Sequence, residues 1–523
     1  MYQYHWLPAG LVQPDQIEEF ARFYSEHYGF WGHKGLRPHS HIKITSSLLA
    51  NWMTQDSLVV WATLFEKLVG YAITVQTTIP RVGTVAWVTQ LVVHEDHRNQ
   101  DVGKALVFSM WGFTDHFAWG VLSANPFAVR ALEKATRRRC QPVPIRRHAK
   151  QLLSLGQRHI PYISESTELV TTNTESRINT EFFVDHSELN NMLQAVISEE
   201  HPWTLGSLPE GWEWFAFTFR QQPQIHLTPE ELNEMLSASD QITREAYSRM
   251  PIDSTSHRWA QFTELEIQFI IKNCGLNNKK SVLDFGCGVG RHSVALAKHG
   301  LNVTGVDYIH SFIDQAKASV ASAMLPNADF IEADCRSVSL EKRFDVGLCL
   351  YDVIGSYADE SRNVEILTNL VQHVKPSGYV LLSVMNMELT ERLAKHWFSI
   401  EEEPDALLAL KPSATMETSG NVFNPAYYMI DRNTRIVYRK EQFRTGQALP
   451  EELIVRDRRY DRLSIQQICQ RAGLDVLWVR LVRSGHWEES LDPSSSSAKE
   501  ILVLCKMPDS RDFQITLFDL DGG

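Results

Sequence analysis

A glycine-rich turn beside an acidic residue is the clearest chemical feature of this chain. The segment VLDFGCGVGR begins at Val282 and places Asp284 before Gly286, Gly288 and Gly290. The pattern predicts a buried strand over residues 282–285, a turn on the glycines and a helix over residues 291–298. Such a turn lets a ligand approach bare backbone at the start of a helix.

Two acidic residues narrow the kind of ligand that this turn accepts. The carboxylate of Asp284 would repel a pyrophosphate but would attract an amino group or a sulfonium. Asp307 ends the next apolar segment, NVTGVD, about 20 residues past the turn, the distance at which an acid accepts hydrogen bonds from ribose hydroxyls. The residues therefore favour a nucleoside ligand with a cationic group over a dinucleotide.

The D-x-G-x-G-x-G pattern that starts at Asp284 resembles the S-adenosylmethionine site of class I methyltransferases. The resemblance continues in order to about Met507, and the alternation of strands and helices predicts a Rossmann-like, doubly wound parallel sheet in an α/β domain. It implies that S-adenosylmethionine is the cofactor, that Asp307 holds its ribose, and that Asp334 with Cys335 flanks its adenine. A structural turn in another α/β fold is the alternative.

Two polar residues follow the fourth expected strand, in FDVGLCLYDVIGSY. Tyr351 and Asp352 are our candidates for catalysis, because ligands gather at the carboxyl ends of strands in open sheets. One of them would remove a proton from the acceptor, while proximity and alignment would supply most of the rate. Ordinary surface-loop chemistry is the alternative.

Segments around this domain predict a cover for the site. The turn formers DRNT, at residues 431–434, separate two alternating segments and predict an antiparallel hairpin. By the resemblance, such an insertion is a lid over the substrate. Helices expected over residues 230–250 and 262–272, with His257 and Trp259 between them, could close over the cofactor. Packing is the alternative for these aromatic residues.

The acceptor is expected to be a small molecule. The segment LYDVIG lacks the [DNS]-P-P-[FYW] pattern that holds the exocyclic amine of a nucleobase, and no Pro-Cys nucleophile is present for pyrimidine carbon chemistry. An amine or a hydroxyl of a metabolite is therefore the simplest acceptor.

A second turn with binding chemistry lies within the first 140 residues. The segment WVTQLVVHEDHRNQDVGKALVFSMWGF predicts a strand, a polar turn and a helix that begins near Val102, and SANPFAVRALEKATRRRC predicts another helix. Together they resemble the Gcn5-related N-acetyltransferases, which are α+β proteins whose R-x-x-G-x-G turn holds the pyrophosphate of acetyl-coenzyme A. The resemblance assigns this cofactor to Val93, Arg98, Gln100, Val102, Gly103, Lys104 and Asn125.

This first domain departs from the family at two positions. Asp101 stands where the first glycine of the turn belongs, which places a carboxylate toward the pyrophosphate and a Cβ where positive φ is needed. Leu132 replaces a tyrosine that serves as general acid in many members. Gln90, His94 and Glu95 remain as candidate bases, and a scaffold without catalysis is the alternative.

Charge and composition limit the remaining functions. The run from Arg137 to Lys150, RRRCQPVPIRRHAK, contains no acid in a chain of net charge −12, so it could bind phosphates of coenzyme A or nucleic acid. A solvated helix end is the alternative, and no aromatic residue interleaves with it. The chain has 43% hydrophobic residues, no long apolar stretch and no secretory signal, which favours a cytoplasmic globular protein without membrane partners.

The 523 residues allow several domains. We expect an acetyltransferase-like domain over 1–150, an α/β extension of unassigned role over 151–225, and the methyltransferase over 226–523, where Thr228, Pro229 and Glu231 predict a capped helix start. The chain would be a bifunctional enzyme that modifies one metabolite by acyl transfer and methylation. The alternatives are a methyltransferase whose first domain only binds, and a nucleic-acid-associated enzyme; the sequence leaves the oligomeric state open.

Overall fold

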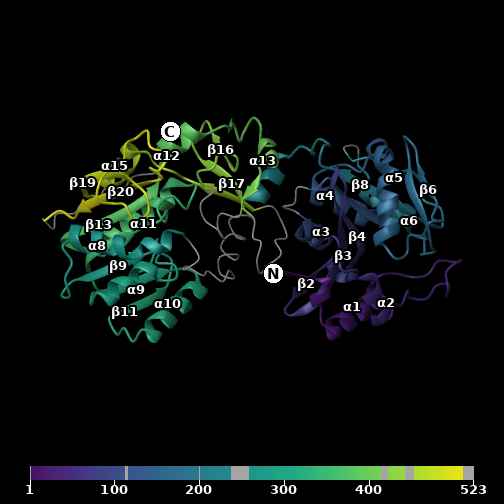
Figure 1. Cartoon of the computed structure of the whole chain (residues 1–523), viewed down its shortest axis with the longest axis horizontal. Coiled ribbons are helices and arrows are strands. Elements are labelled where there is room, and N and C mark those ends of the chain that lie inside the picture. The colour runs from purple at the N-terminus through teal and green to yellow at the C-terminus, as the bar shows by residue number, and fades with distance from the viewer. Residues whose placement is uncertain are drawn as a thin grey trace. The chain divides into compact units, whose positions relative to one another are not determined.

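The chain forms two compact units, each with its own sheet and core. The computed structural model describes residues 2–111, 116–198, 201–236, 258–413, 422–441 and 453–509. One unit extends to His226, and the other begins at Leu227 (Figure 1).

The first unit is built on one mixed sheet of eight strands, in the order β1-β2-β3-β4-β5-β8-β7-β6. Neighbouring strands are antiparallel except for β4 and β5. In chain order the elements are β1 (Gln3–Pro8), η1 (Ala9–Leu11), α1 (Pro14–His27), α2 (Ser46–Trp52), β2 (Ser57–Leu64), β3 (Lys67–Ile79), β4 (Gly83–Val93), η2 (Glu95–His97), α3 (Val102–Trp111), β5 (Ala118–Ser123), α4 (Pro126–Thr136), α5 (Pro142–His159), β6 (Leu169–Thr171), β7 (Ser176–Phe182), α6 (Leu189–Val196) and β8 (Gly211–Phe219).

Alternation along the strands explains why helices cover both faces of this sheet. Val59 and Tyr71 face α1 and α2, whereas their neighbours Val60 and Ala72 join the core beneath α3, α4 and α5. Because successive residues of a strand point to opposite faces, one apolar strand can serve two cores. The helix expected near Val102 is present as α3, but the acetyltransferase family itself stays a prediction.

The segment expected as a separate extension continues this sheet. Residue 150, the expected domain limit, lies inside α5, and β8 pairs with β5 while β7 and β6 follow at the edge. All eight strands up to His226 therefore belong to one continuous sheet.

The second unit contains a seven-stranded sheet in the order β11-β10-β9-β12-β13-β20-β19 and a smaller sheet. Its elements in chain order are η3 (Arg258–Phe262), α8 (Thr263–Asn273), β9 (Ser281–Phe285), α9 (Arg291–Lys298), β10 (Asn302–Asp307), α10 (His310–Ser322), β11 (Ala328–Glu332), β12 (Phe344–Cys349), α11 (Glu360–Gln372), β13 (Val374–Met385), α12 (Met387–Leu393), β14 (Trp397–Phe398), α13 (Ala406–Ala409), β15 (Pro412–Ser413), β16 (Tyr428–Asp431), β17 (Val437–Glu441), β18 (Leu453–Asp457), α15 (Arg462–Arg471), β19 (Asp475–Val482) and β20 (Glu500–Lys506).

The large sheet confirms the predicted Rossmann-like architecture. Strands β9 to β13 are parallel, and the order reverses between β9 and β12, which is the point where ligands bind in such sheets. Helices α8 and α9 cover one face through residues such as Ile267, and α11 and α15 cover the other through residues such as Leu370.

The predicted hairpin is present and belongs to a larger insertion. Strands β16 and β17 pair antiparallel around the turn at residues 431–434, where Asp431 accepts a hydrogen bond from the backbone of Thr434. Strand β18 adds to β17, and β14 and β15 complete the small sheet. The expected single hairpin is thus the centre of a five-stranded sheet.

The helices expected before the second unit are described in part. Thr228 and Glu231 form the predicted reciprocal cap, with bonds of 3.0 and 3.2 Å, and the helix is described over residues 229–236. The remainder of the 230–250 segment, His257 and the side chain of Trp259 lie outside the described residues. The second expected helix is α8.

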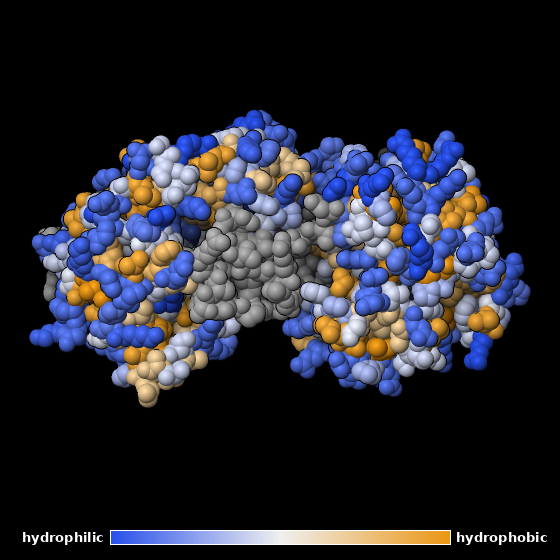
Figure 2. Space-filling model, viewed as in Figure 1, coloured by the Kyte–Doolittle hydropathy of each residue, from blue (hydrophilic) through white to orange (hydrophobic). Residues whose placement is uncertain are grey.

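The visible face of each unit is mostly hydrophilic, with small scattered hydrophobic areas (Figure 2). Apolar side chains are concentrated instead in the cores between helices and sheets. Within the described ranges, no helix combines the length and the apolar character that crossing a membrane requires.

Candidate functional site

The glycine turn of the second unit joins β9 to α9 at the carboxyl edge of the sheet. Its three glycines, Gly286, Gly288 and Gly290, have φ values of 67°, 54° and 78°. A Cβ on Gly286 would lie 2.3 Å from Val353 Cγ2, so both the conformation and the space require glycine there. The amide of Gly286 donates to Val306 O at 2.8 Å, which locks the turn against β10.

Asp307 ends β10 beside this turn, as the sequence predicts. Its Oδ2 accepts the amide of Gly288 at 2.9 Å, and its Oδ1 accepts the amide of Ile309 at 3.0 Å. Burial raises the pKa of the Asp307 carboxyl, although these amides oppose the shift. The carboxylate therefore supports the turn and lies where a ligand on the turn would meet it.

Asp284 lies next to the turn on β9 and is almost fully buried, with 3% of its surface exposed. Ser293 Oγ donates to its Oδ2 at 2.5 Å. Burial raises the pKa of Asp284 to about 6, because a charged carboxylate loses its hydration there. A cationic group close to Asp284 would compensate for that loss.

Asp334 and Cys335 follow β11 at the same edge. Arg336 binds Asp334 through Nη2 at 2.6 Å and Nε at 3.0 Å, so the carboxylate is already paired with a guanidinium. The Cys335 thiol is buried and burial raises its pKa, which keeps it protonated. A ligand at this edge would therefore meet a carboxylate that is already paired with Arg336 and a neutral thiol, but no thiolate.

Tyr351 and Asp352 leave β12 in a strained conformation. Their φ values are 57° and 67°, in the left-handed region that non-glycine residues rarely adopt. Two such residues in succession cost about 1–3 kcal/mol each, and backbone strain of this kind clusters at active sites. Both residues lie just after the end of β12, at the carboxyl edge of the sheet.

The Tyr351 hydroxyl is engaged in a buried network that the sequence did not reveal. It donates to Glu266 of α8, which also accepts Arg291 Nη1 at 2.8 Å and His292 Nε2 at 2.9 Å. Burial raises the pKa of Tyr351 well above its ordinary value, so the phenol stays protonated. Burial lowers the pKa of His292 to about 4, so this ring is neutral and the contact with Glu266 is a hydrogen bond.

Asp352 differs from Tyr351 because part of its carboxylate has no partner. Among the described residues, Asp352 Oδ1 and Glu500 Oε2 are buried without a hydrogen bond. Burial raises the pKa of Asp352 to about 7 and that of Glu500 to about 8. Glu500 begins β20, which is antiparallel to β13, so its amino end reaches the edge where β12 and β13 end.

A family model described as a methyltransferase domain matches residues 282–378, the stretch that holds the turn, Asp307 and Asp352. The second unit carries a class I, S-adenosylmethionine-dependent methyltransferase domain. The predicted identity of this unit is thereby confirmed, whereas the predicted identity of the first unit is not addressed by the match.

Curated relatives cover the same part of the chain. The chain is 31% identical over 162 residues to a ubiquinone biosynthesis O-methyltransferase of Rickettsia conorii, covering 31% of this chain and 53% of the relative. It is 30% identical over 148 residues to the protein of that name from Rickettsia prowazekii, covering 26% and 57%. The chain thus spans about half the length of these relatives.

Solved methyltransferases also align with the chain. An S-adenosylmethionine-dependent methyltransferase from Clostridium acetobutylicum is 15% identical, covers 53% of this chain and 98% of its own, and gives a TM-score of 0.33.

Several residues of the methyltransferase domain escaped the sequence interpretation. Arg291 and His292 directly follow the turn, so their position was a usable signal. Glu266 and Glu500 offered none, because only the tertiary fold brings α8 and the start of β20 to the end of β12. The carboxyl edge therefore gathers more buried ionisable groups than the motif alone indicates.

The turn of the first unit has the expected place at the start of α3 but many internal contacts. Asp101 takes φ 55° where the family pattern has glycine, and Lys134 Nζ lies 3.2 Å from its Oδ1. Arg98 donates to the carbonyls of Val93 and His27, at 3.1 and 2.7 Å. These contacts tie the turn to neighbouring elements and offset the charge of Asp101.

The other residues expected at this turn have structural partners as well. Gln100 Oε1 accepts from Tyr2 Oη at 2.6 Å, and Asn125 caps α4 through a bond from Phe127 N at 2.9 Å. Val102 is buried in the core. Gly103 and Lys104 lie in the first turn of α3.

The basic run is partly structural. Arg139 Nη1 lies 3.3 Å from Glu133 Oε2, and the Arg138 guanidinium lies over the ring of Trp119 at 5.4 Å. Most of the rest belongs to α5. The run is thus a helix connection with internal partners, and its phosphate binding stays a prediction.

Proposed function

We propose that the second unit transfers the methyl group of S-adenosylmethionine to a hydroxyl or an amine of a small molecule, with Asp352 as the base. The observation that carries this proposal is the buried, unpartnered carboxylate oxygen of Asp352 at the carboxyl edge of the sheet. A buried polar atom without a partner is costly, and it is compensated when a ligand supplies the missing hydrogen bond.

The donor would occupy the glycine turn between β9 and α9. Asp284 would compensate the amino or sulfonium charge, and Asp307 would accept from the ribose hydroxyls. Asp334 and Cys335 would flank the adenine. A cation beside Asp284 would also restore the ionised form that burial disfavours.

The chemical step needs only a proton acceptor and alignment. S-adenosylmethionine would supply the methyl group and leave as a thioether, and Asp352 would accept the proton of the acceptor oxygen or nitrogen. A base whose pKa is raised to about 7 is well suited to this task near neutral pH. Tyr351 would position the site through Glu266, because its own phenol stays protonated.

An untargeted screen can identify the acceptor. Purified protein with S-adenosylmethionine would be incubated with a metabolite extract, and mass spectrometry would search for compounds that gain a methyl group. We expect the product to be absent with Asp352→Asn, while calorimetric binding of S-adenosylmethionine persists. The proposal would be refuted if the wild-type protein did not bind S-adenosylmethionine, or if Asp352→Asn kept full activity.

We also propose that the first unit binds a coenzyme A thioester at the start of α3. Strands β4 and β5 pair only over Val85–Val88, so within the described residues the last part of β4 has no β5 partner. The backbone of Asp101 adopts the left-handed conformation that a glycine would adopt in this turn, and Lys134 offsets the charge of the Asp101 carboxylate. Calorimetry with acetyl-coenzyme A would test this, with Lys134→Ala expected to weaken binding; no heat with the wild-type protein would exclude acyl transfer by this unit.

A further inference from the structure

His27, His94 and Glu95 bring two imidazoles and a carboxylate together in the first unit, and His94 and Glu95 were considered above only as candidate bases. One candidate ligand atom from each of the three lies within 4.8 Å of the others. His27 ends α1, and His94 and Glu95 follow β4 directly at the start of η2. The cluster therefore joins segments that are far apart in sequence at one point of the surface.

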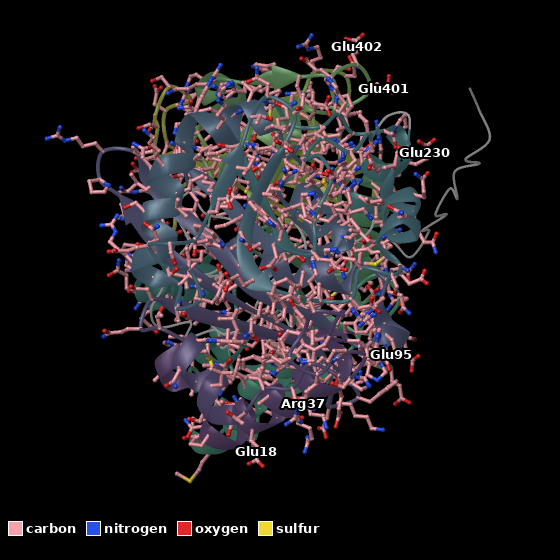
Figure 3. The ribbon with its side chains drawn as sticks, turned by 90° about the vertical axis from the view of Figure 1, so that its right-hand side faces the viewer. Glu18, Arg37, Glu95, Glu230, Glu401 and Glu402 are labelled. Atoms are coloured by element: carbon pink, nitrogen blue, oxygen red, sulfur yellow. The ribbon has the colours of Figure 1, made fainter. Side chains whose placement is uncertain are left out.

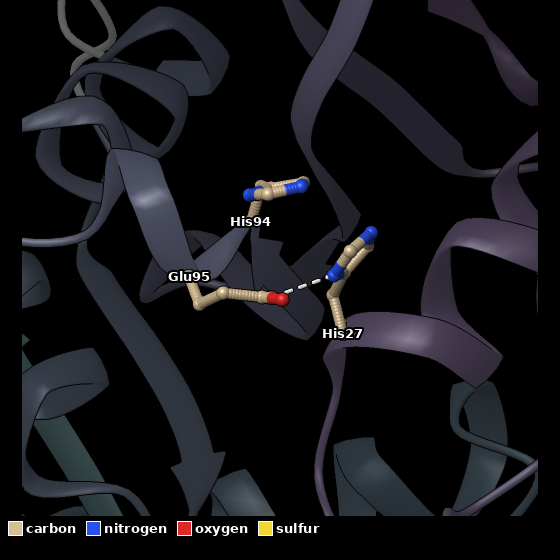
Figure 4. A group of neighbouring side chains, drawn as sticks. All are labelled: His27, His94 and Glu95. Carbon is tan, nitrogen blue, oxygen red and sulfur yellow. Dashed lines mark hydrogen bonds and ion pairs between the residues drawn. The ribbon is translucent and has the colours of Figure 1, made fainter.

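The three side chains turn toward one another (Figure 4). His27 Nδ1 lies 2.7 Å from Glu95 Oε2, and the rings of His27 and His94 have centroids 4.2 Å apart. The ring of Phe23 lies 4.6 Å from that of His27 and forms an apolar wall. Glu95 lies at the edge of the molecule, so the cluster is open to solvent on that side (Figure 3).

The backbone beneath the cluster is held in place. Arg98 donates to the carbonyl of His27 at 2.7 Å and to that of Val93 at 3.1 Å, which ties the end of α1 to the end of β4. The amide of His94 donates to Val69 O at 3.0 Å. The backbone that carries the three side chains is therefore arranged before any ion binds, which lowers the entropic cost of binding.

We propose that His27, His94 and Glu95 bind a divalent transition-metal ion of the zinc type. Two neutral imidazoles and one carboxylate are the ligands of an established class of zinc site, which keeps a further position open for solvent or substrate. Zinc–ligand distances of about 2.0 Å in a tetrahedral site place ligand atoms about 3.3 Å apart, so small side-chain rotations close the observed spacing.

Two further carboxylates, those of Asp96 and Glu26, lie close to the candidate ligands. The amide of Asp96 donates to His94 Nδ1 at 3.2 Å and holds the ring in place, and Asp96 Oδ2 lies 3.9 Å from the same nitrogen. The ion would replace the hydrogen bond between His27 and Glu95 as the link between these two side chains. Glu26 Oε2, at 3.8 Å from His27 Nε2, adds negative charge.

The test uses the full chain without a polyhistidine tag, treated with a chelator and then titrated with Zn²⁺. We expect saturable binding of one ion, which calorimetry detects. Co²⁺ in place of Zn²⁺ should give a visible absorption band that reports its ligands. No saturable Zn²⁺ binding in the wild-type chain would overturn the proposal.

Variants identify the ligands. Loss of a residue that only supports a metal ligand weakens metal binding by about 10–100-fold. His94→Ala and Glu95→Gln remove ligands themselves, so each should weaken Zn²⁺ binding by more than that. His97→Ala is the matched control, because His97 lies next to His94 in the structure but is bonded to Tyr2 Oη at 2.9 Å. Circular dichroism checks that each variant folds. If His97→Ala lost the ion while His94→Ala kept it, the assigned ligands would be wrong.

Discussion

Replacing Glu266 by alanine should destabilise the methyltransferase domain strongly. Its side chain is fully buried, and the carboxylate accepts from Arg291, His292, Tyr351 and the amide of Gly485. Burial by itself raises the pKa of Glu266, but these partners outweigh it and lower the pKa overall, so the group is ionised. The substitution leaves the cation of Arg291 nearly buried without its carboxylate.

The magnitude follows from the partners that are lost. Removing one member of a buried ion pair costs about 3–5 kcal/mol, because the remaining charge is uncompensated. Each hydrogen bond that loses its acceptor adds about 1 kcal/mol, although such contributions are not additive within one network. We therefore expect a loss of at least about 3 kcal/mol in the free energy of opening of this domain.

Glu264 provides a matched control on the same helix. It lies two residues away, pairs with His299 at 2.9 Å and has 57% of its side chain exposed, so Glu264→Ala should cost less than about 1 kcal/mol. Hydrogen–deuterium exchange of peptides from α8, β9 and α9 measures opening of this unit alone, and β8 peptides serve as an internal reference. Equal losses for the two variants, or a loss below about 1 kcal/mol for Glu266→Ala, would refute the reasoning.

Three further predictions concern the donor, the base and pH. Asp307→Ala should weaken S-adenosylmethionine binding at least about tenfold by calorimetry, since hydrogen bonds to a charged group contribute about 1.5–3 kcal/mol; exposed Asp314→Ala should not. Asp352→Asn should lower the methylation rate about 10²–10⁴-fold and abolish a rise in rate with pH that is centred near pKa 7 in the wild type. Burial raises the pKa of Glu213 to about 7, so between about pH 4 and 7 this side chain holds a proton in the folded protein that it has released in the unfolded chain. The free energy of unfolding should therefore fall as pH rises over this range, and urea titrations should show a smaller fall for Glu213→Gln. An unchanged pH dependence in Glu213→Gln would contradict this assignment.

The sequence predicted the elements of the methyltransferase domain because local signals agree there. The alternation of β9, the glycines of the turn and the start of α9 all indicate one structure, and β16 with β17 follows the turn formers between them. The small sheet was predicted only in part. Its outer strands β14 and β15 have two residues each, too few for alternation to be visible.

The site was harder to predict than the fold. Asp284, Asp307 and Asp352 lie at or just beyond the carboxyl ends of strands. In a parallel sheet these ends meet at one edge, so the topology explains why the three residues are neighbours. Glu266 and Glu500 come from a flanking helix and an antiparallel strand, and no spacing in the sequence connects them with β12. The strain at Tyr351 and Asp352 was also hidden, because tyrosine does not indicate left-handed backbone and aspartate adopts it only more often than most other residues do.

The left-handed backbone conformation of Asp352 affects which variants a selection for stability would favour. Asp352→Gly would relieve about 1–3 kcal/mol of backbone strain and would remove a buried oxygen that lacks a partner. It would also remove the proposed base. A search for heat-resistant variants would therefore favour the loss of this side chain, so stability and activity are opposed at a single position.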